Sequence, residues 1–296
     1  MSFDRHARRR IFSHSMTILS GLAVVVILVP LAAVIYEAVL KGGAAFSLGF
    51  FTERPALPCT TVGGQTCPLG GVYPAIEGTL ILMGLASLWS VPVGLGAAVF
   101  TVEYGRDRAV ARAISTVADV LSGVPSILAG VFLYALLLQY NPSLAFSTLT
   151  GSLALGVLMI PVVARTCEEA LRTVPNSVRE AALALGISRW KTSIRIVLVS
   201  ALPGVVTGIL LSVGRAAGEA APLLFTLGNS CVHPFQGVDQ QGCALPLWIF
   251  VGATSPYQNW IALAWGAALL LILMILAISV TSRLALERMV RRMGGG

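Results

Sequence analysis

The stretch IVLVSALPGVVTGILLSVGRAAGEAAPLLFTL, residues 196–227, contains only two charged side chains, Arg215 and Glu219. It is longer than the about 20 apolar residues that a helix needs to cross a bilayer. An ionisable residue inside a membrane is energetically costly, so it normally faces a bundle interior or an aqueous path. Read as one helix, the stretch places the two groups on one face, because they are four residues apart. We therefore expect a membrane protein that moves something charged.

The composition supports the same class. The chain has 296 residues, of which 56% are hydrophobic and 11% are charged, whereas a soluble domain carries about 25% charged residues. Segments long enough to span a membrane occur at residues 17–36, 74–102, 114–138, 144–164, 196–220 and 260–280. The sequence therefore predicts an all-α integral membrane protein with six transmembrane helices.

The placement of basic residues predicts the orientation of these helices. Arginine and lysine gather at residues 5–10, 106–112, 165–195 and 283–292, whereas Lys41 and Arg54 fall on the other side. Cytoplasmic connections carry the excess of basic residues, so both termini are predicted in the cytoplasm of a bacterial cell, below its plasma (inner) membrane. The net charge of +7 is thus explained without nucleic acid.

This topology divides the chain into segments. The first helix is kept in the mature protein, because its apolar core is longer than the 7–15 residues of a cleavable signal segment. The resulting segments are a cytoplasmic N-terminal segment at 1–16, a first transmembrane helix at 17–40, an extracytoplasmic loop at 41–73, a core at 74–282 with a cytoplasmic loop at 165–195 and an extracytoplasmic loop at 228–259, and a cytoplasmic tail at 283–296. The two long outer loops are candidate docking surfaces for an external partner, or packed caps over the helix ends.

The five cysteines are distributed by the same topology. Cys59 and Cys67 lie in the first outer loop, Cys231 and Cys243 in the second, and Cys167 falls on the cytoplasmic side. Cysteines in an oxidising compartment favour disulfides, and four of them allow three connectivities. We prefer Cys59–Cys67 and Cys231–Cys243; the alternative is free thiols.

The third apolar segment contains LSGVPS at 121–126. Proline removes a backbone donor and clashes with the preceding turn, so we expect a kink near 121–125. The bend either lines a pathway or serves packing, and its candidate residues are Asp119, Ser122, Gly123, Pro125 and Ser126. Asp119 lies near the cytoplasmic end, where pairing with a local arginine is the alternative to a pathway role.

The cytoplasmic loop reads NSVREAALALGISRWK at 176–191. Ser177 and Glu180 have capping-box spacing, so a short helix is predicted to begin there. Gly186 suits the left-handed residue that ends a helix, and Ser188 can cap a second one. A DNA-binding helix-turn-helix and a passive connector are the alternatives. Attachment to membrane helices at both ends opposes entry of this segment into a DNA groove. A docking helix for a cytoplasmic partner is favoured.

The same residues carry a family resemblance. The series Glu180, Ala181, Ala182, then Gly186 and later Ile196, resembles the EAA loop of permeases of ABC importers, the binding-protein-dependent transport family. Val199 stands where the family pattern has a proline. The resemblance implies a type I importer fold and a coupling helix, with Glu180, Ala181, Ala182 and Gly186 seated in a cleft of an ATPase subunit.

Other segments point to a subfamily. GRAAGEAAPLLF at 214–225, GVYPAIEGT at 71–79, LSGVPS at 121–126 and RTCEEALR at 165–172 are similar to the phosphate-specific PstA-type permeases. This resemblance implies a PstC-like homologous permease, two PstB-like ATPases that bind ATP and Mg, and a PstS-like phosphate-binding protein outside. It also implies a non-catalytic chain surrounded by membrane lipid.

The chain itself shows no nucleotide or metal motif. A phosphate-binding loop requires Gly-x4-Gly-Lys-Ser/Thr, and Trp190 precedes Lys191-Thr192 where a glycine is needed. The three histidines show no metal-ligand spacing with cysteine or acidic residues. We therefore expect no catalytic residues, no metal site and no cofactor in this chain.

The pair of Arg215 and Glu219 suits phosphate chemically. A guanidinium matches oxyanion geometry bidentately, and a carboxylate can accept a hydrogen bond from the proton of hydrogen phosphate, which sulfate lacks. The alternatives are an intrahelical ion pair that neutralises itself, or a gate that exchanges partners. At the level of function, the alternatives are a permease for another oxyanion, such as sulfate or a phosphonate, and a non-transporting scaffold or sensor.

Overall fold

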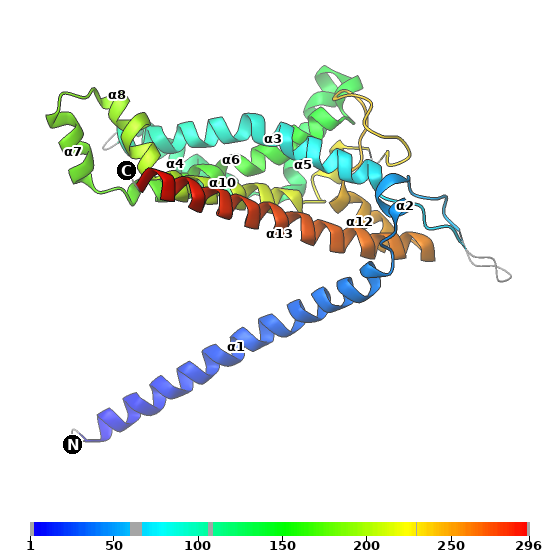
Figure 1. The fold of residues 1–296 in the computed structure, drawn as a ribbon, viewed down its shortest axis with the longest axis horizontal. Helices are drawn as coiled ribbons and strands as arrows, with labels where there is room; N and C mark the ends of the chain where they lie inside the picture. Colours follow the sequence, from blue (N-terminus) through cyan, green and yellow to red (C-terminus); the bar gives the residue numbers. More distant parts are fainter. Residues whose placement is uncertain (1–2, 60–66, 106–108, 229, 295–296) are drawn as a thin grey trace.

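The computed structural model describes residues 3–59, 67–105, 109–228 and 230–294, and over these ranges it is built of helices (Figure 1). Arg106 and Arg108, which count toward the predicted cytoplasmic side, lie outside these residues. Within the described ranges, the helical segments Phe12–Gly43, Tyr73–Tyr104, Thr148–Arg172 and Gln258–Leu284 are long and apolar enough to cross a membrane, and two bent helix pairs bring the possible crossings to six. The predicted all-α membrane class is confirmed.

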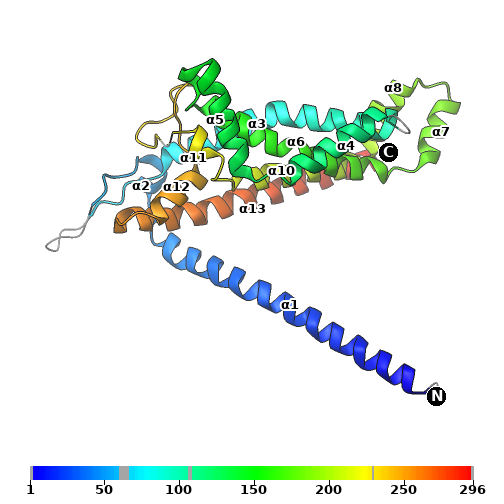
Figure 2. The ribbon, with the colours of Figure 1, turned by 180° about the vertical axis from the view of Figure 1, so that it is seen from behind.

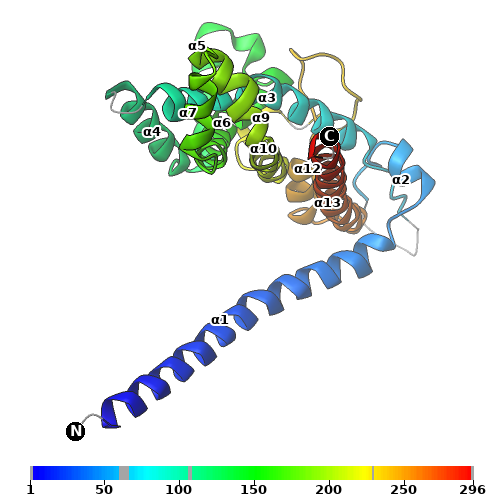
Figure 3. The same cartoon turned by 60° about the vertical axis from the view of Figure 1, so that its left-hand side comes forward.

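The first half of the chain forms α1 to α5. Its elements are α1 (Phe3–Gly43), α2 (Leu48–Thr52), α3 (Tyr73–Val99) with the π-helical turn η1 (Phe100–Tyr104), α4 (Ala109–Ser122), α5 (Ser126–Tyr140) and the short η2 (Pro142–Leu144). α1 leaves the bundle at an angle and extends away from it in three views (Figures 1, 2 and 3). It contacts α13 through its C-terminal turns, where the Lys41 ammonium lies 5.1 Å from the Trp265 ring centroid.

The second half contributes the centre of the bundle. Its elements are α6 (Thr148–Arg172), α7 (Asn176–Ala184), α8 (Arg189–Lys191), the π-helical η3 (Thr192–Val197), α9 (Leu198–Ser200), α10 (Leu202–Ala217), α11 (Leu223–Thr226), α12 (Leu245–Ala253) and α13 (Gln258–Gly294). α6 packs between α3 and α10, and Leu82 of α3, Leu155 of α6 and Leu223 of α11 are buried together. Burial of such apolar side chains holds the bundle together away from lipid.

The third predicted span is broken rather than kinked. α4 ends at Ser122, α5 begins at Ser126, and the two axes differ by 102°. The N–H groups of Gly123 and Val124 bond back three residues, to Val120 and Leu121, which closes α4 in a tight turn. Pro125 then adopts an extended ψ of 130° before α5, because the proline ring cannot continue the preceding helix.

The fifth predicted span is also divided, and this corrects one expectation. Residues Arg189–Ser200 bend by 72° into α10, which ends at Ala217 with Gly218 as its C-cap. Glu219 lies beyond the helix, so it does not share a helix face with Arg215. Gly218 is a poor helix former, and Pro222 four residues later cannot lie inside a continuing helix, so the helix stops between the two charged residues.

Part of the predicted loop at 228–259 is a helix. α12 occupies Leu245–Ala253, with Leu247 and Trp248 buried. Its first turn contains Pro246, which is tolerated there because the missing N–H would have no partner within the helix. The outer connection is therefore shorter than expected, and its second half packs against α13 and α3.

Candidate functional site

A cavity of about 220 Å3 lies where α4, α5, α6 and α10 meet. It brings Arg215 and Glu219 next to the bend between α4 and α5, although the bend and the two charged residues are about 90 positions apart in the sequence. Its polar lining consists of Ser122, Ser126, Ser212, Arg215 and Glu219. We refer to it as the central cavity.

The central cavity is equipped for an anion. Arg215 is exposed and Glu219 partly buried, and the ion pairs found within the described ranges do not include one between them. The guanidinium is thus free of the self-neutralising partner that i, i+4 spacing suggested. The N-terminal end of the 15-residue α5 borders the same space at Ser126, and helix N-termini favour negative charge.

Two residues of the predicted bend lie elsewhere. Gly123 is in the turn after α4 and is not among the residues that line the central cavity. Asp119 occupies the last turn of α4, where its Oδ1 accepts a 2.9 Å hydrogen bond from the Arg165 Nε on α6. Arg165 also donates to Glu168 at 2.9 Å and to the Ser115 carbonyl at 2.8 Å. The structure thus favours the pairing alternative for Asp119, and this network ties α4 to α6.

The predicted docking helix is α7, which projects with α8 from one end of the bundle (Figure 1). Glu180 and Ala181 are exposed, whereas Ala182 is buried. Gly186 has a φ of +77°, a left-handed conformation that glycine adopts without a steric penalty. An accessible helix face therefore lies beyond the body of the bundle, and the turn at Gly186 ends this helix.

The capping expectations for this segment are wrong in detail. α7 begins at Asn176 after Pro175, so Ser177 lies inside its first turn instead of capping it. Pro175 has an extended ψ of 147° and already ends the preceding segment; it therefore sets the helix start before Ser177. Ser188 does occupy the N-cap position of α8, but its carbonyl, not its side chain, accepts the hydrogen bond from the Thr192 N–H.

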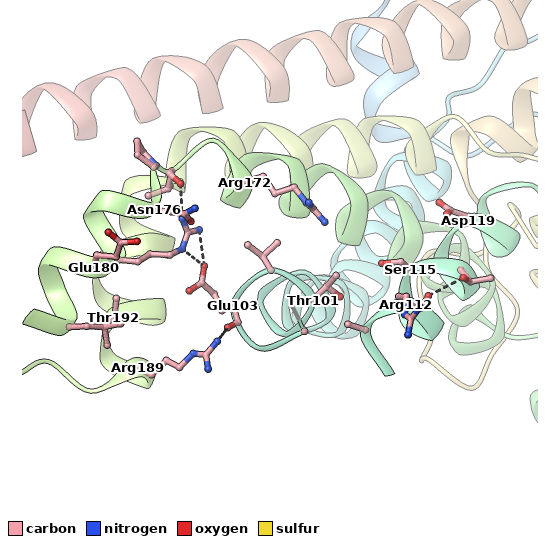
Figure 4. Close-up of a pocket in the computed structure, with 18 residues that line it drawn as sticks. Thr101, Glu103, Arg112, Ser115, Asp119, Arg172, Asn176, Glu180, Arg189 and Thr192 are labelled. Carbon is pink, nitrogen blue, oxygen red and sulfur yellow. Dashed lines mark hydrogen bonds and ion pairs between the residues drawn. The ribbon is translucent and has the colours of Figure 1, made fainter. Parts of the chain in front are cut away.

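A second cavity, of about 1290 Å3, opens between α4, η1 and α7 (Figure 4). Charged side chains of both signs line it, and sequence reasoning missed the most buried of them, Glu103, which is 7% exposed. The Glu103 carboxylate accepts a 2.9 Å hydrogen bond from the Arg179 Nε of α7. One signal in the sequence could have indicated Glu103: it is the first acidic residue after a long apolar run, immediately next to the predicted span 74–102.

The outer cysteines pair within their own segments. Cys59 is bonded to Cys67, and Cys231 to Cys243, with Cα–Cα distances of 5.8 and 4.9 Å. Cys167 is buried in α6 as a free thiol. The bonded cysteines are 8 and 12 positions apart in the sequence, and Cys231 and Cys243 pack with Leu245 and Trp248 of α12.

Alkylation of the purified protein should therefore distinguish Cys167 from the other four cysteines. Without reductant, we expect an alkylating reagent to add one label, on Cys167, and only after denaturation exposes α6. With reductant, five labels should appear, which intact-protein mass spectrometry can count. Native labelling of the four outer cysteines without reductant would contradict the pairing, and a Cys167→Ser variant serves as the control for assignment.

The structure combines a bundle of spanning helices with an arginine-bearing cavity among them and an exposed helix at one end. These features define a component of a membrane transport system. The chain belongs to the family described as binding-protein-dependent transport system inner membrane component, whose model matches residues 90–295.

Individual relatives extend this result over most of the chain. It is 40% identical over 280 residues to the phosphate transport system permease protein PstA 1 of Mycobacterium tuberculosis (strain CDC 1551 / Oshkosh), covering 93% of this chain and 88% of that protein. It is 35% identical to the phosphate transport system permease protein PstA of Pasteurella multocida (strain Pm70), covering 93% and 95% of the two chains.

A solved structure has the same fold. An inward-facing conformation of the MetNI methionine ABC transporter aligns with a TM-score of 0.56 and 19% identity, covering 75% of this chain and 93% of that one. The family establishes an ABC transporter permease, a membrane subunit that does not itself hydrolyse ATP, and the likeness shows its fold.

Proposed function

We propose that the chain is the permease subunit of an ATP-driven importer of inorganic phosphate, and that it forms half of the translocation pathway. The central cavity carries the proposal, because it places Arg215, which forms no ion pair with an acidic residue of the described ranges, in the same space as Ser126 at the N-terminus of α5. The names of the relatives, which are phosphate transport permeases, support the choice of substrate. Such a site offers hydrogen-bond donors and positive charge to an oxyanion.

Glu219 supplies the discrimination between oxyanions. Hydrogen phosphate carries an O–H group that can donate a hydrogen bond to a carboxylate, whereas fully ionised sulfate would place its charge against Glu219 with no hydrogen bond between them. Sites whose buried polar groups are left unmatched by a competitor reject it strongly. Glu219 lines the same cavity as Arg215 from beyond the end of α10, so both groups can face one bound ion.

The partners follow from the same proposal. A homologous PstC-like permease would supply the other half of the pathway, and two PstB-like ATPases would bind ATP and Mg. The helix α7, with Glu180, Ala181 and Ala182 followed by Gly186, would lie in an ATPase cleft. A PstS-like phosphate-binding protein would dock at the opposite end, on the disulfide-bearing segments. The cytoplasmic placement of both termini belongs to this proposal, as do the segment boundaries given above.

Transport by the assembled complex tests the proposed function. In proteoliposomes that contain this chain, the second permease, the ATPases and the binding protein, we expect uptake of radiolabelled phosphate that stops without ATP. A large excess of sulfate should leave this uptake unchanged, because sulfate offers no proton to Glu219. Uptake of sulfate or a phosphonate in place of phosphate would overturn the substrate, and failure to transport any oxyanion would overturn the function.

A further inference from the structure

Glu103 is the meeting point of three segments. It lies in the π-helical turn η1 that ends α3, and its carboxylate accepts from the Arg179 guanidinium of α7 and, at 3.3 Å, from the Ser193 hydroxyl of η3. Its backbone carbonyl accepts from Arg189 of α8. Figure 4 shows Glu103 between Arg189 and the segment that bears Asn176 and Glu180. We call Glu103, Arg179, Arg189 and Ser193 the Glu103 hub.

Arg179 is fully engaged in this hub. Besides Glu103, its guanidinium donates to the Val174 carbonyl at 2.6 Å and the Leu171 carbonyl at 3.1 Å. These carbonyls lie at and after the C-terminal end of α6, where backbone acceptors lack helical partners. A guanidinium bound on several sides in a fixed fork geometry has little freedom to move. The ion pair is also largely shielded from water, since Arg179 and Glu103 side chains are 17% and 5% exposed.

The backbone at the Glu103 hub has an unusual helical conformation. Both η1 and η3 are π-helical, and single π-helical turns within α-helices are frequent at functional sites. The two wide turns meet at the contact between Glu103 and Ser193. This arrangement fastens the docking helix and the segment that follows it to the end of α3, which is remote from both in sequence.

The opposite end of α3 is fastened as well. The Thr79 hydroxyl accepts a 2.8 Å hydrogen bond from the Leu245 N–H, and the Glu77 carboxylate accepts one of 3.1 Å from the Phe235 N–H. Leu245 begins α12, and Phe235 lies inside the loop closed by the Cys231–Cys243 disulfide. α3 and η1 together form one unbroken helical span of 32 residues, Tyr73–Tyr104, which contains both attachments.

We propose that Glu103 is a positioning residue that fastens the docking helix α7 to α3, so that α3 carries the movement of α7 to the disulfide-bearing outer segment at residues 231–245. The inference rests on the proposed function, because it assumes that an ATPase moves α7. Without the hub, α7 would keep its chain connections and the apolar packing of Val178 but no polar link to α3, and part of its movement would be absorbed at the turns around Val174 and Gly186. With the hub, the movement that ATPase closure causes in α7 is passed to α3 and reaches the outer segment at the other end of this helix.

Uncoupling is the first test. In the reconstituted complex, we expect Glu103→Gln and Arg179→Lys to keep ATP hydrolysis near the wild-type rate while phosphate uptake falls about 3- to 30-fold, the range in which single residues alter coupling between sites. Exposed Glu287→Gln and Arg283→Lys on α13 are the matched controls and should change neither rate. A parallel fall of hydrolysis and uptake would reduce Glu103 to a role in assembly, and unchanged uptake would refute the inference.

A distance measurement tests the rigid link without any transported substrate. Spin labels on Ser177 of α7 and Leu88 of α3, both exposed, should keep one separation in nucleotide-free and vanadate-trapped wild-type complexes. In Glu103→Gln, trapping should change this separation. A separation that changes in the wild type, or stays constant in the variant, would overturn the link. Lack of phosphate uptake by the wild type would instead remove the proposed function and leave the distance result intact.

Discussion

Replacement of Arg215 by lysine is expected to reduce ATP-dependent phosphate uptake by about 10- to 100-fold, although the positive charge is kept. A guanidinium offers a planar fork of donors that matches two oxyanion oxygens, whereas an ammonium acts as a point charge. Loss of one hydrogen bond to a charged group corresponds to about 1.5–3 kcal/mol, which is this range of rates if the contact is made during passage. Arg215 lies at the wall of the central cavity with Ser212 one turn earlier on the same helix.

The measurement is initial phosphate uptake in proteoliposomes, together with ATPase activity and complex yield. Exposed Arg195 in η3 provides the matched control, since Arg195→Lys makes the same change outside the cavity and should leave uptake near the wild-type rate. Arg215→Gln should lose more activity than Arg215→Lys because it also removes the charge. If Arg215→Lys transports phosphate as well as the wild type, direct coordination by the guanidinium is excluded.

The second large effect is expected at Gly78, where α3 passes against the outer segment. A Cβ built at Gly78 would lie 1.9 Å from the Cys243 carbonyl oxygen. The obstacle is backbone held by a disulfide and by the neighbouring Thr79–Leu245 hydrogen bond, so it cannot rotate aside as a side chain would. Overpacking of this kind destabilises by about 1–3 kcal/mol or more. Gly78→Ala should therefore lower the melting temperature by roughly 5 °C or more.

Gly84 supplies a control on the same helix. A Cβ at Gly84 would meet no atom within 4 Å, so Gly84→Ala should be neutral or should stabilise α3 by up to about 1 kcal/mol through helix propensity. Thermal unfolding monitored by size-exclusion fluorescence compares the two variants in the same detergent. Equal melting temperatures for Gly78→Ala and Gly84→Ala would show that α3 and the outer segment are not in contact as described.

Local signals in the sequence predicted the broad fold. Apolar length alone was enough for the long spans, because a bilayer sets that length physically. The left-handed conformation of Gly186 could also be predicted, since few residues other than glycine adopt it after a helix. The breaks were harder to predict: Pro125 and Gly218 each weaken a helix locally, but only packing against α6 determines whether the chain bends slightly or by 102°.

The contacts between distant segments could not be read from the sequence. Arg215 and Ser122 reach one cavity only because α10 and α4 both pack on α6. Glu103 and Arg179 are 76 positions apart, and their pairing depends on the register of α3 against the chain that follows α6. Arg165 bonds Glu168, three positions away on α6, which helix spacing could have indicated. It also bonds Asp119, which is 46 positions away, and no local pattern indicates that contact.

The exposure of α1 has a consequence for how the helices insert into the membrane. None of the most apolar part of this helix is buried in the bundle, whereas 61% of the corresponding part of α6 is. A helix whose apolar surface faces outward needs no other helix to cover it in a bilayer, because its backbone hydrogen bonds are internal and lipid solvates its side chains. α1 can therefore be stable in the bilayer by itself. α6, with its polar and small side chains turned inward, has to wait for α3 and α10 before it is stably inserted.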